Sequence, residues 1–528
     1  MQGLEITRAC DVFLRPCSAP DYDSVMASER TTHATASDST LTAAWNELDR
    51  PSDTRALLRS ADHAAAEAFL LAAAQQQGSE RHDSLRRGGE QLLLNGQIDR
   101  ALSVMRALSN EIDLTVPERS PALHLQLALS QLQLKLRGWK RAQRSRPPAQ
   151  LQTLRTLAIG LADAAPVQAL TAALRYVHLA LDAGDSLHLV RALGLSAALS
   201  GSADLDARWA EQALSRMDNV AAEDGSAQAQ GFASLIHAWV SQQQEQFAAA
   251  RKHASAALAQ LRECADVEWE IEQASLLDQI SACALGDFAT SQHTTTVLLE
   301  GALQRGRVFS AAKLAGLCGA AAWLAADDVE GYRRVLPEVR QRLPRASRAD
   351  AAAHWLLLGE AAVSIYTSEP AAGFGLLERA SHTQPAFVHN QRKLQLAQHS
   401  LLKAQAAASA LRVSASSGRL REPIEQAVRL LERYNAPARV SAAECLRAAL
   451  ALEAGLWLPA THRLAAALQL QAEAGLEMSA AATRRRLGQL TGGVAGRQLV
   501  VNAEASMRAQ GVKNLEAMTE LLCPGVRG

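Results

Sequence analysis

Apolar residues recur at intervals of three and four along most of the chain, from about Leu41 to Leu522, and short polar turns interrupt them. This spacing places the apolar side chains on one face of an α-helix. Val, Ile and the aromatic residues, which fit pleated sheets, are sparse. The pattern predicts an all-α protein built from successive amphipathic helices.

The turns between the predicted helices share a pattern, in which a small or turn-forming residue precedes an apolar residue by two or three positions. Gly or Asp at such a corner supplies the left-handed conformation or the N-cap that a helical hairpin needs. The segments with this pattern are NGQIDRALSVM (95–105), AGDSLHLVRAL (183–193), LGDFATSQHTTTVLL (285–299), ADDVEGYRRVL (326–336) and AGLWLPATHRLAAAL (454–468).

The middle of the chain has a regular period. Its corner residues, each 41 positions after the last, are Glu245, Gly286, Asp327 and Ser368. The aligned apolar residues are Phe247, Phe288 and Val329 after the corners and Leu276, Leu317 and Leu358 in the second helices, with Pro370 and His399 in the corresponding places of the last copy. A period near 40 with two helices per unit predicts an α-solenoid of tetratricopeptide-like (TPR-like) hairpins. The aligned apolar side chains are expected to form the core between hairpins.

Three segments are expected along the chain. Residues 1–42 are polar with little periodicity, which predicts a flexible leader. Residues 43–476 form the predicted solenoid of roughly ten hairpins. Residues 477–528 are predicted to form a C-terminal helical cap of three short helices, with Asn514 capping the last of them.

Composition narrows the classes of function. The 528 residues carry 54 Lys and Arg against 54 Asp and Glu, which argues against a general nucleic-acid binder. The sequence lacks a transmembrane run and an apolar signal segment, so no membrane association is expected. Seven cysteines without a CxxC motif favour a reducing compartment. We therefore expect a cytoplasmic protein.

Motifs of catalysis are missing from the sequence. GGVAGR at 492–497 lacks the Lys and the Ser or Thr of a phosphate-binding loop, and the kinase motifs HRD and DFG do not occur. HExxH, GxSxG and paired Cys/His spacings do not occur either. The expectation is a protein that is not an enzyme and that uses no cofactor or metal.

One segment, LKLRGWKRAQRSRPP at 134–148, concentrates positive charge without any acid. The arginines could neutralise an anionic ligand or contact a partner, and the tryptophan could stack on it. The alternative is a solvated helix end whose cations complement the helix dipole. The candidate residues are Lys135, Arg137, Trp139, Lys140, Arg141, Arg144 and Arg146.

The C-terminal residues carry a more specific pattern, RRRLG…GG…G…MxxQGxxN…M. It is made by Arg484–Gly488, Gly492, Gly493, Gly496, Met507, Gln510, Gly511, Asn514 and Met518. This pattern resembles the end of the TPR-like region of large bacterial fusion proteins that join a serine/threonine kinase to an AAA-type ATPase. The resemblance covers about residues 60–528, and the kinase and ATPase modules have no counterpart here, so it transfers no catalytic residue.

Together these features predict a helical-repeat protein that mediates protein–protein interaction. The resemblance implies a regulatory scaffold or sensor in kinase or ATPase signalling, with a kinase or an ATPase as the protein partner. A solenoid that senses a small molecule or a peptide is the alternative. Nucleic-acid binding through residues 135–146 is a third interpretation, which the neutral overall charge disfavours.

Overall fold

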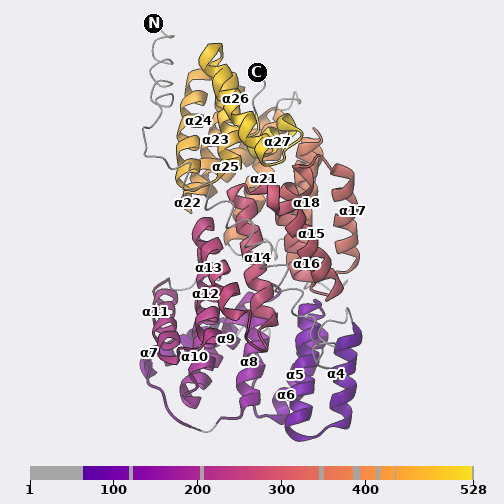
Figure 1. Ribbon diagram of the computed structural model, residues 1–528, viewed down its shortest axis with the longest axis vertical. Coiled ribbons are helices and arrows are strands. Elements are labelled where there is room, and N and C mark those ends of the chain that lie inside the picture. Colours follow the sequence, from indigo (N-terminus) through magenta and orange to yellow (C-terminus); the bar gives the residue numbers. More distant parts are fainter. Residues whose placement is uncertain are drawn as a thin grey trace.

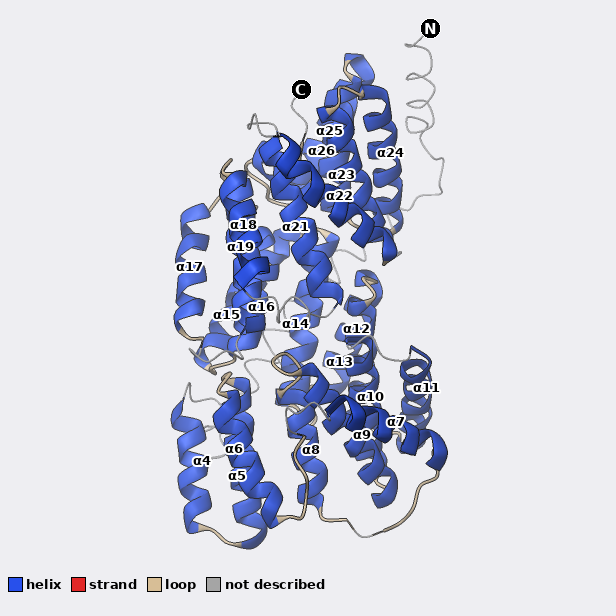
Figure 2. Cartoon of the chain, turned by 180° about the vertical axis from the view of Figure 1, so that it is seen from behind, coloured by secondary structure: helices blue, strands red, loops and turns tan. Residues whose placement is uncertain are grey.

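The computed structural model confirms the all-α class. It describes residues 63–117, 123–144, 146–202, 207–343, 350–383, 393–411, 417–434 and 436–525, so the predicted leader 1–42 lies outside the described residues. Every regular element in these ranges is a helix (Figure 1, Figure 2).

The described ranges contain a succession of helices. In chain order they are α4 (His63–Gln75), α5 (Gly78–Leu94), α6 (Ile98–Glu111), α7 (Leu123–Arg137), α8 (Pro148–Gly160), α9 (Pro166–Ala183), α10 (Ser186–Ser202), α11 (Ala207–Asp224), α12 (Ala227–Gln243), α13 (Phe247–Leu261), α14 (Glu268–Leu285), α15 (Phe288–Gln304), α16 (Val308–Leu317), the short π-helix η1 (Ala320–Leu324), α17 (Val329–Gln341), α18 (Asp350–Tyr366), α19 (Pro370–Thr383), α21 (Lys393–Leu411), α22 (Ser417–Arg433), α23 (Pro437–Glu453), α24 (Trp457–Glu473), α25 (Glu477–Thr491), α26 (Gly493–Ala509) and α27 (Leu515–Leu522).

The 41-residue register is confirmed at its corners. Glu245, Gly286, Asp327 and Ser368 all have positive φ, at 59°, 95°, 57° and 63°. The next helix begins two residues after each corner, at Phe247, Phe288, Val329 and Pro370. At three of these four corners the residue is not glycine, although a positive φ favours glycine. The geometry of the hairpin therefore sets this conformation at every corner, whether or not glycine is present.

The helices that precede these corners pack side by side. α12 contacts α14, and α14 and α18 both contact α16. The aligned Leu276 and Leu358 are buried in α14 and α18, and Leu317 is partly buried at the end of α16. The aligned leucines therefore join successive hairpins into one core, as a solenoid requires.

The C-terminal helices turn back onto the corner edge of the middle hairpins (Figure 1). Arg439 of α23 donates two hydrogen bonds to Glu245, at 2.9 and 2.6 Å. A Cβ atom on Gly286 would lie 2.6 Å from the backbone nitrogen of Met478 in α25, so this corner needs glycine for space as well as for its φ. The backbone N–H of Lys513 donates to the carbonyl of Ala325 at 2.9 Å.

The last three helices, α25, α26 and α27, are the three expected at 477–528. The Asn514 side chain accepts a hydrogen bond from the N–H of Ala517 at 3.1 Å and caps α27, as predicted. α25 and α26 touch backbone to backbone, because a Cβ on Gly488 would lie 2.6 Å from the carbonyl oxygen of Gly496. Two of the motif glycines thus serve the close crossing of these helices.

Candidate functional site

The predicted basic segment runs from the end of α7 across the end of α9. The N–H of Ala142 donates to the carbonyl of Leu181 at 2.8 Å, and the N–H of Arg144 donates to the carbonyl of Asp182 at 2.9 Å. These backbone bonds satisfy carbonyl groups in the last turn of α9, which has no further helical partner for them. The segment is thereby fixed to the α9–α10 corner.

Carboxylates neutralise three of its arginines. Arg137 and Arg146 each donate to one oxygen of Asp182 at 2.7 Å, and Arg141 donates to Glu223 at 2.8 Å. Burial alone would raise the pKa of Asp182, but the hydrogen bonds from Arg146 and Arg137 outweigh it and hold this pKa below its ordinary value. These arginines bind the segment to the fold.

The other four candidate residues divide into two kinds. Trp139 stacks on Trp209 of α11, with ring centroids 5.2 Å apart, so one face of its ring is already covered. Lys135, Lys140 and Arg144 are exposed. The exposed basic surface is therefore narrower than the sequence suggests.

A row of exposed leucines lies on α7, directly before this surface. The exposed fractions are 61% for Leu125, 47% for Leu129, 51% for Leu132 and 80% for Leu136. We call these four residues the leucine row. Leu127 and Leu134, on the face that packs against α9, are only 3% exposed. The sequence analysis missed this row, although its signal is present in LHLQLALSQLQLKLR, where leucine occupies both faces of the helix.

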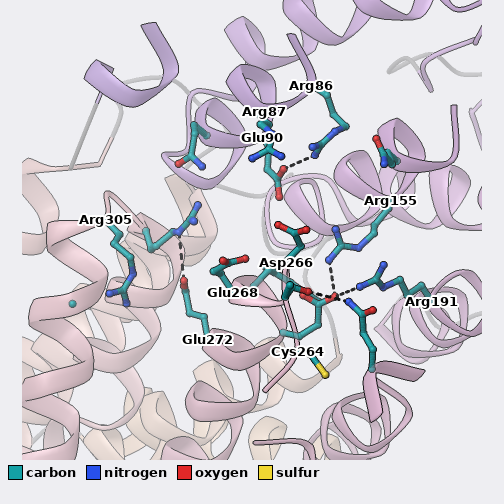
Figure 3. Close-up of a pocket in the computed structure, with 18 of the residues that line it drawn as sticks. Arg86, Arg87, Glu90, Arg155, Arg191, Cys264, Asp266, Glu268, Glu272 and Arg305 are labelled. Carbon is teal, nitrogen blue, oxygen red and sulfur yellow. Dashed lines mark hydrogen bonds and ion pairs between the residues drawn. The ribbon is translucent and has the colours of Figure 1, made fainter. Parts of the chain in front are cut away.

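A second candidate site is a cleft of about 910 Å³ between α5, α8, α10, α14, α15 and the start of α16 (Figure 3). Arginines reach it from several sides: Arg155 and Arg191 from one side, Arg305 from the opposite side, and Arg86 and Arg87 from above in this view. We call it the arginine cleft. The arginines that line it are Arg86, Arg87, Arg155, Arg191, Arg305 and Arg307.

Two buried glutamates of α14 form the floor of the arginine cleft. Glu270 is 1% exposed, and its Oε1 accepts from Arg155 at 2.6 Å and from Arg191 at 3.4 Å. Glu272 accepts from the Ser310 hydroxyl at 2.6 Å and lies 3.4 Å from Nε of Arg307. The two carboxylates therefore hold arginines from other helices at the arginine cleft.

The α5 wall of the cleft is balanced by its own acids. Arg86 pairs with Asp83 at 2.7 Å and with Glu90 at 2.9 Å, and Arg87 pairs with Asp83 at 2.7 Å. All of these pairs are three or four residues apart on one helix, where facing side chains meet. The further carboxylates that line the cleft are Asp266, Glu268 and Glu300.

Positive charge and burial shift the pKa values of groups in the cleft. Burial, with the neighbouring Arg307, lowers the pKa of Arg305 to about 10 despite the opposing effect of Glu272. Burial also lowers the pKa of His188 to about 4, and the charges of Arg191 and Arg155 add to the effect. The His188 ring is therefore neutral at pH 7, where its Nδ1 shares a hydrogen bond with the Tyr176 hydroxyl.

Several buried polar atoms of the cleft have no hydrogen-bond partner within the protein. They are Nε of Arg155, Nε of Arg191, Nη1 of Arg307 and Oε2 of Glu270. Buried donors without acceptors are costly and mark places where a ligand or water binds. The lining as a whole carries six arginines against seven carboxylates, so its charges are nearly balanced.

The arginines of the C-terminal motif are arranged differently. Arg486 is fully buried and donates to the carbonyl of Cys523 at 3.2 Å, to Gln489 at 3.0 Å, to Glu516 at 2.9 Å and to Glu520 at 2.6 Å. Arg485 pairs with Glu504 at 3.1 Å and also with Glu516. These two arginines bind α25 to α26, α27 and the residues after α27, which gives the RRR motif a structural role.

The comparisons with known proteins give no family for this chain. A scan against protein-family models and a search of curated proteins both return no match. Among the described residues, no group of three or more His, Cys, Asp or Glu side chains is placed to hold a metal ion. None of the described helices combines the length and the apolar character needed to cross a membrane.

Proposed function

We propose that this chain is a non-catalytic protein-binding solenoid and that the leucine row of α7, with the cations that follow it, is its contact surface. The observation that carries the proposal is the exposure of four leucines on one face of one helix. Contiguous exposed apolar residues are uncommon on soluble proteins and mark interaction sites.

The spacing of the leucine row favours a helical partner. Leu125, Leu129, Leu132 and Leu136 are separated by four, three and four residues, which is the alternation of a coiled-coil seam. Side chains at this spacing insert as knobs between the residues of a facing helix. An extended strand would meet only alternate positions and would leave part of the row in water.

Charge indicates what kind of helix fits. The segment from Leu123 to Arg146 contains no acid. Of its exposed cations, Lys140 and Arg144 follow the leucine row, and Lys135 precedes the last leucine of the row, Leu136. We therefore propose an amphipathic helix with acidic residues at one end as the partner segment, since opposite charges steer association and fix its direction. The resemblance of residues 60–528 to kinase–ATPase fusions supports a kinase or an ATPase as the protein that carries it.

The test replaces three leucines of the leucine row and leaves the buried residues of α7 unchanged. In the variant Leu129→Gln, Leu132→Gln, Leu136→Gln, the buried Leu127 and Leu134 remain, so the fold is expected to persist. Crosslinking of the full chain in cell extract, followed by mass spectrometry, should place a partner's helix on α7 in the native protein. The triple variant should lose that crosslink.

The matched control replaces exposed valines on another helix, Val494→Gln and Val501→Gln on α26, which are 77% and 59% exposed. This variant should retain the α7 crosslink. Retention of the crosslink by the triple variant would contradict the proposal. So would a homodimer in sedimentation analysis that the triple variant abolishes, because the row would then be covered by a second copy of the chain.

A further inference from the structure

We propose that Cys445 and Cys523 form an oxidation site, at which hydrogen peroxide converts the two thiols into a disulfide that fastens the residue after α27 to α23. The site shares no residue with the leucine row, so this inference is independent of the protein-binding proposal. It adds a redox modification to the C-terminal helices.

The fold brings the two cysteines together in one small core. Cys445 of α23 is 4% exposed, and Cys523, directly after α27, is 1% exposed. Both belong to a hydrophobic cluster that also contains residues of α24, α25 and α26. Their thiols are close enough to hydrogen-bond to each other.

The backbone after Cys523 also lies against α23. A Cβ atom on Gly525 would lie 2.7 Å from the Cβ atom of Ala449, which is one helical turn after Cys445. A disulfide can form without backbone movement only where the two chain segments are already adjacent. The contact of Gly525 with Ala449 shows that this condition is met beside the two thiols.

Polar groups surround the sulfur atoms, although the cluster is otherwise apolar. The Thr483 hydroxyl of α25 lies 3.6 Å from Sγ of Cys445, and Nε2 of Gln471 in α24 donates to the same sulfur at 3.8 Å. Arg486 donates to the carbonyl of Cys523 at 3.2 Å. A buried thiol that serves only as a small apolar group needs none of these partners, whereas a thiolate is stabilised by nearby donors and cations.

The surroundings assign different roles to the two thiols. The hydrogen bond with the Cys445 thiol lowers the pKa of Cys523, against the effect of burial. The charge of Arg486 and a hydrogen bond with Thr483 lower this pKa further, while Glu520 raises it. The same hydrogen bond between thiols, together with burial, raises the pKa of Cys445. Cys523 is therefore the attacking thiolate, and Cys445 is the thiol that completes the disulfide.

The oxidation has two steps. The Cys523 thiolate attacks one oxygen of hydrogen peroxide, so that an S–O bond forms and the O–O bond breaks. The hydroxide that leaves takes up the proton released by Cys523 and becomes water. The Cys445 sulfur then attacks the sulfur of the sulfenic acid, the S–S bond forms, and the S–O bond breaks. The leaving oxygen departs as water with the proton of Cys445, so two thiols and one peroxide give one disulfide and two waters.

Local opening of α27 gives the peroxide access to the buried sulfur of Cys523. This helix has only eight residues, and short elements open at a lower free energy than the whole fold. Once formed, the disulfide opposes that opening, because it joins the end of α27 to α23. Thiols of the reducing compartment that the sequence predicts would reverse it, which makes the bond transient.

The experiment treats the full folded chain with hydrogen peroxide, quenches it with acid, alkylates the remaining thiols in denaturant and maps unreduced peptides by mass spectrometry. We expect a linked pair of peptides that carry Cys445 and Cys523 and that separate after reduction with dithiothreitol. If Cys523 is instead unmodified, oxidised to the sulfinic acid or linked to another cysteine, the proposal is wrong.

Thermal unfolding tests whether the bond fastens α27. The oxidised chain should have a Tm several degrees above that of the reduced chain, because a crosslink restricts the unfolded state. An unchanged or lower Tm in a chain that carries the crosslink would overturn the fastening role.

The variant Cys445→Ser separates the two steps. Without the second thiol, the oxidation of Cys523 should stop at the sulfenic acid, and dimedone should label Cys523 several-fold more in this variant than in the native chain. Equal labelling would show that Cys445 does not complete the reaction. The matched control is Cys264→Ser, since the Cys264 thiol donates to the carbonyl of Gln260 outside this cluster. The control should form the crosslink of Cys445 with Cys523 at the native rate, and its failure to do so would also count against the proposal.

Discussion

Two regions that contain buried arginines, the surroundings of Arg486 and the arginine cleft, differ in how fully those arginines are paired. Around Arg486, every donor group has an acceptor: a carbonyl, an amide and two carboxylates. In the arginine cleft, Arg155 and Arg191 share one oxygen of Glu270, and their Nε atoms have no acceptor within the protein. Guanidinium groups are largely shielded from solvent in both regions, but only those around Arg486 have an acceptor for every donor group.

The difference separates arginines whose hydrogen bonds are saturated within the protein from arginines whose Nε donors have no acceptor there. A saturated guanidinium stabilises the elements that supply its acceptors, because removing it leaves those acceptors buried and unpaired. An unsaturated guanidinium costs folding energy until an acceptor arrives, and that cost is what a ligand can recover. Sequence clustering alone does not distinguish the two, since the RRR run at 484–486 and the scattered arginines of the cleft give opposite outcomes.

The largest effect is expected at the saturated cluster. Replacement of Arg486 by Met should lower the free energy of unfolding by about 3–5 kcal/mol, because the partly buried Glu520 and the buried carbonyl of Cys523 lose their donor. Denaturant unfolding followed by circular dichroism measures the loss. Added phosphate should not restore it, since an anion cannot replace a cation.

The control for this variant is Arg508→Met on α26. Arg508 is 61% exposed and pairs with Glu504 one helical turn away, so its loss should cost less than about 0.5 kcal/mol. If Arg486→Met were as stable as the control, saturation would not measure structural importance, and the contrast between the two regions would fail.

A smaller effect is expected from the histidine of the arginine cleft. The pKa of His188 is about 4 in the folded chain, below its ordinary value, because burial and the nearby arginines disfavour the imidazolium. Between pH 6.5 and 4 the unfolded chain binds this proton and the folded chain does not. Stability from this group is therefore complete above pH 6.5 and is lost as the pH falls toward 4.

Replacement of His188 by Asn removes this titration. Between pH 6.5 and 4 the native protein should lose about 1–3 kcal/mol more stability than the variant does. Urea unfolding at half-unit pH intervals measures the difference. His293→Asn, at an exposed position of α15, is the matched control and should follow the native curve. Parallel curves for native protein and His188→Asn would mean that the cleft does not oppose positive charge.

Much of the fold was predictable, because it depends on local chemistry repeated along the chain. The corners at Glu245, Gly286, Asp327 and Ser368 follow from the 41-residue register, and each adopts the left-handed conformation. Helix starts two residues later follow from the same pattern. The return of the C-terminal helices was not predictable, since the pair of Arg439 with Glu245 joins residues 194 positions apart without any local signal.

The sites were less predictable, because pairing decides what a charged residue does. Residues 135–146 contain no acid of their own, yet Asp182 and Glu223 neutralise three of their arginines from α9 and α11. The arginine cleft joins Arg155 to Glu270 across 115 residues. The leucine row was visible as leucines on both faces of α7, but only the position of α9 determines which face is buried.

The smallest effect on stability is expected from replacing Arg305 in the arginine cleft. Arg305 lines the arginine cleft, where burial and the neighbouring Arg307 lower its pKa to about 10, which means that its surroundings disfavour its charge. Replacement by Gln should therefore change the free energy of unfolding by less than about 1 kcal/mol. Because the surroundings disfavour the charge, we expect this free energy to rise and not to fall. Denaturant unfolding beside Arg486→Met makes the contrast direct: Arg486 is expected to be needed for the fold, and Arg305 is not. A loss of about 3 kcal/mol or more from Arg305→Gln would give Arg305 a structural role and would contradict the contrast with Arg486.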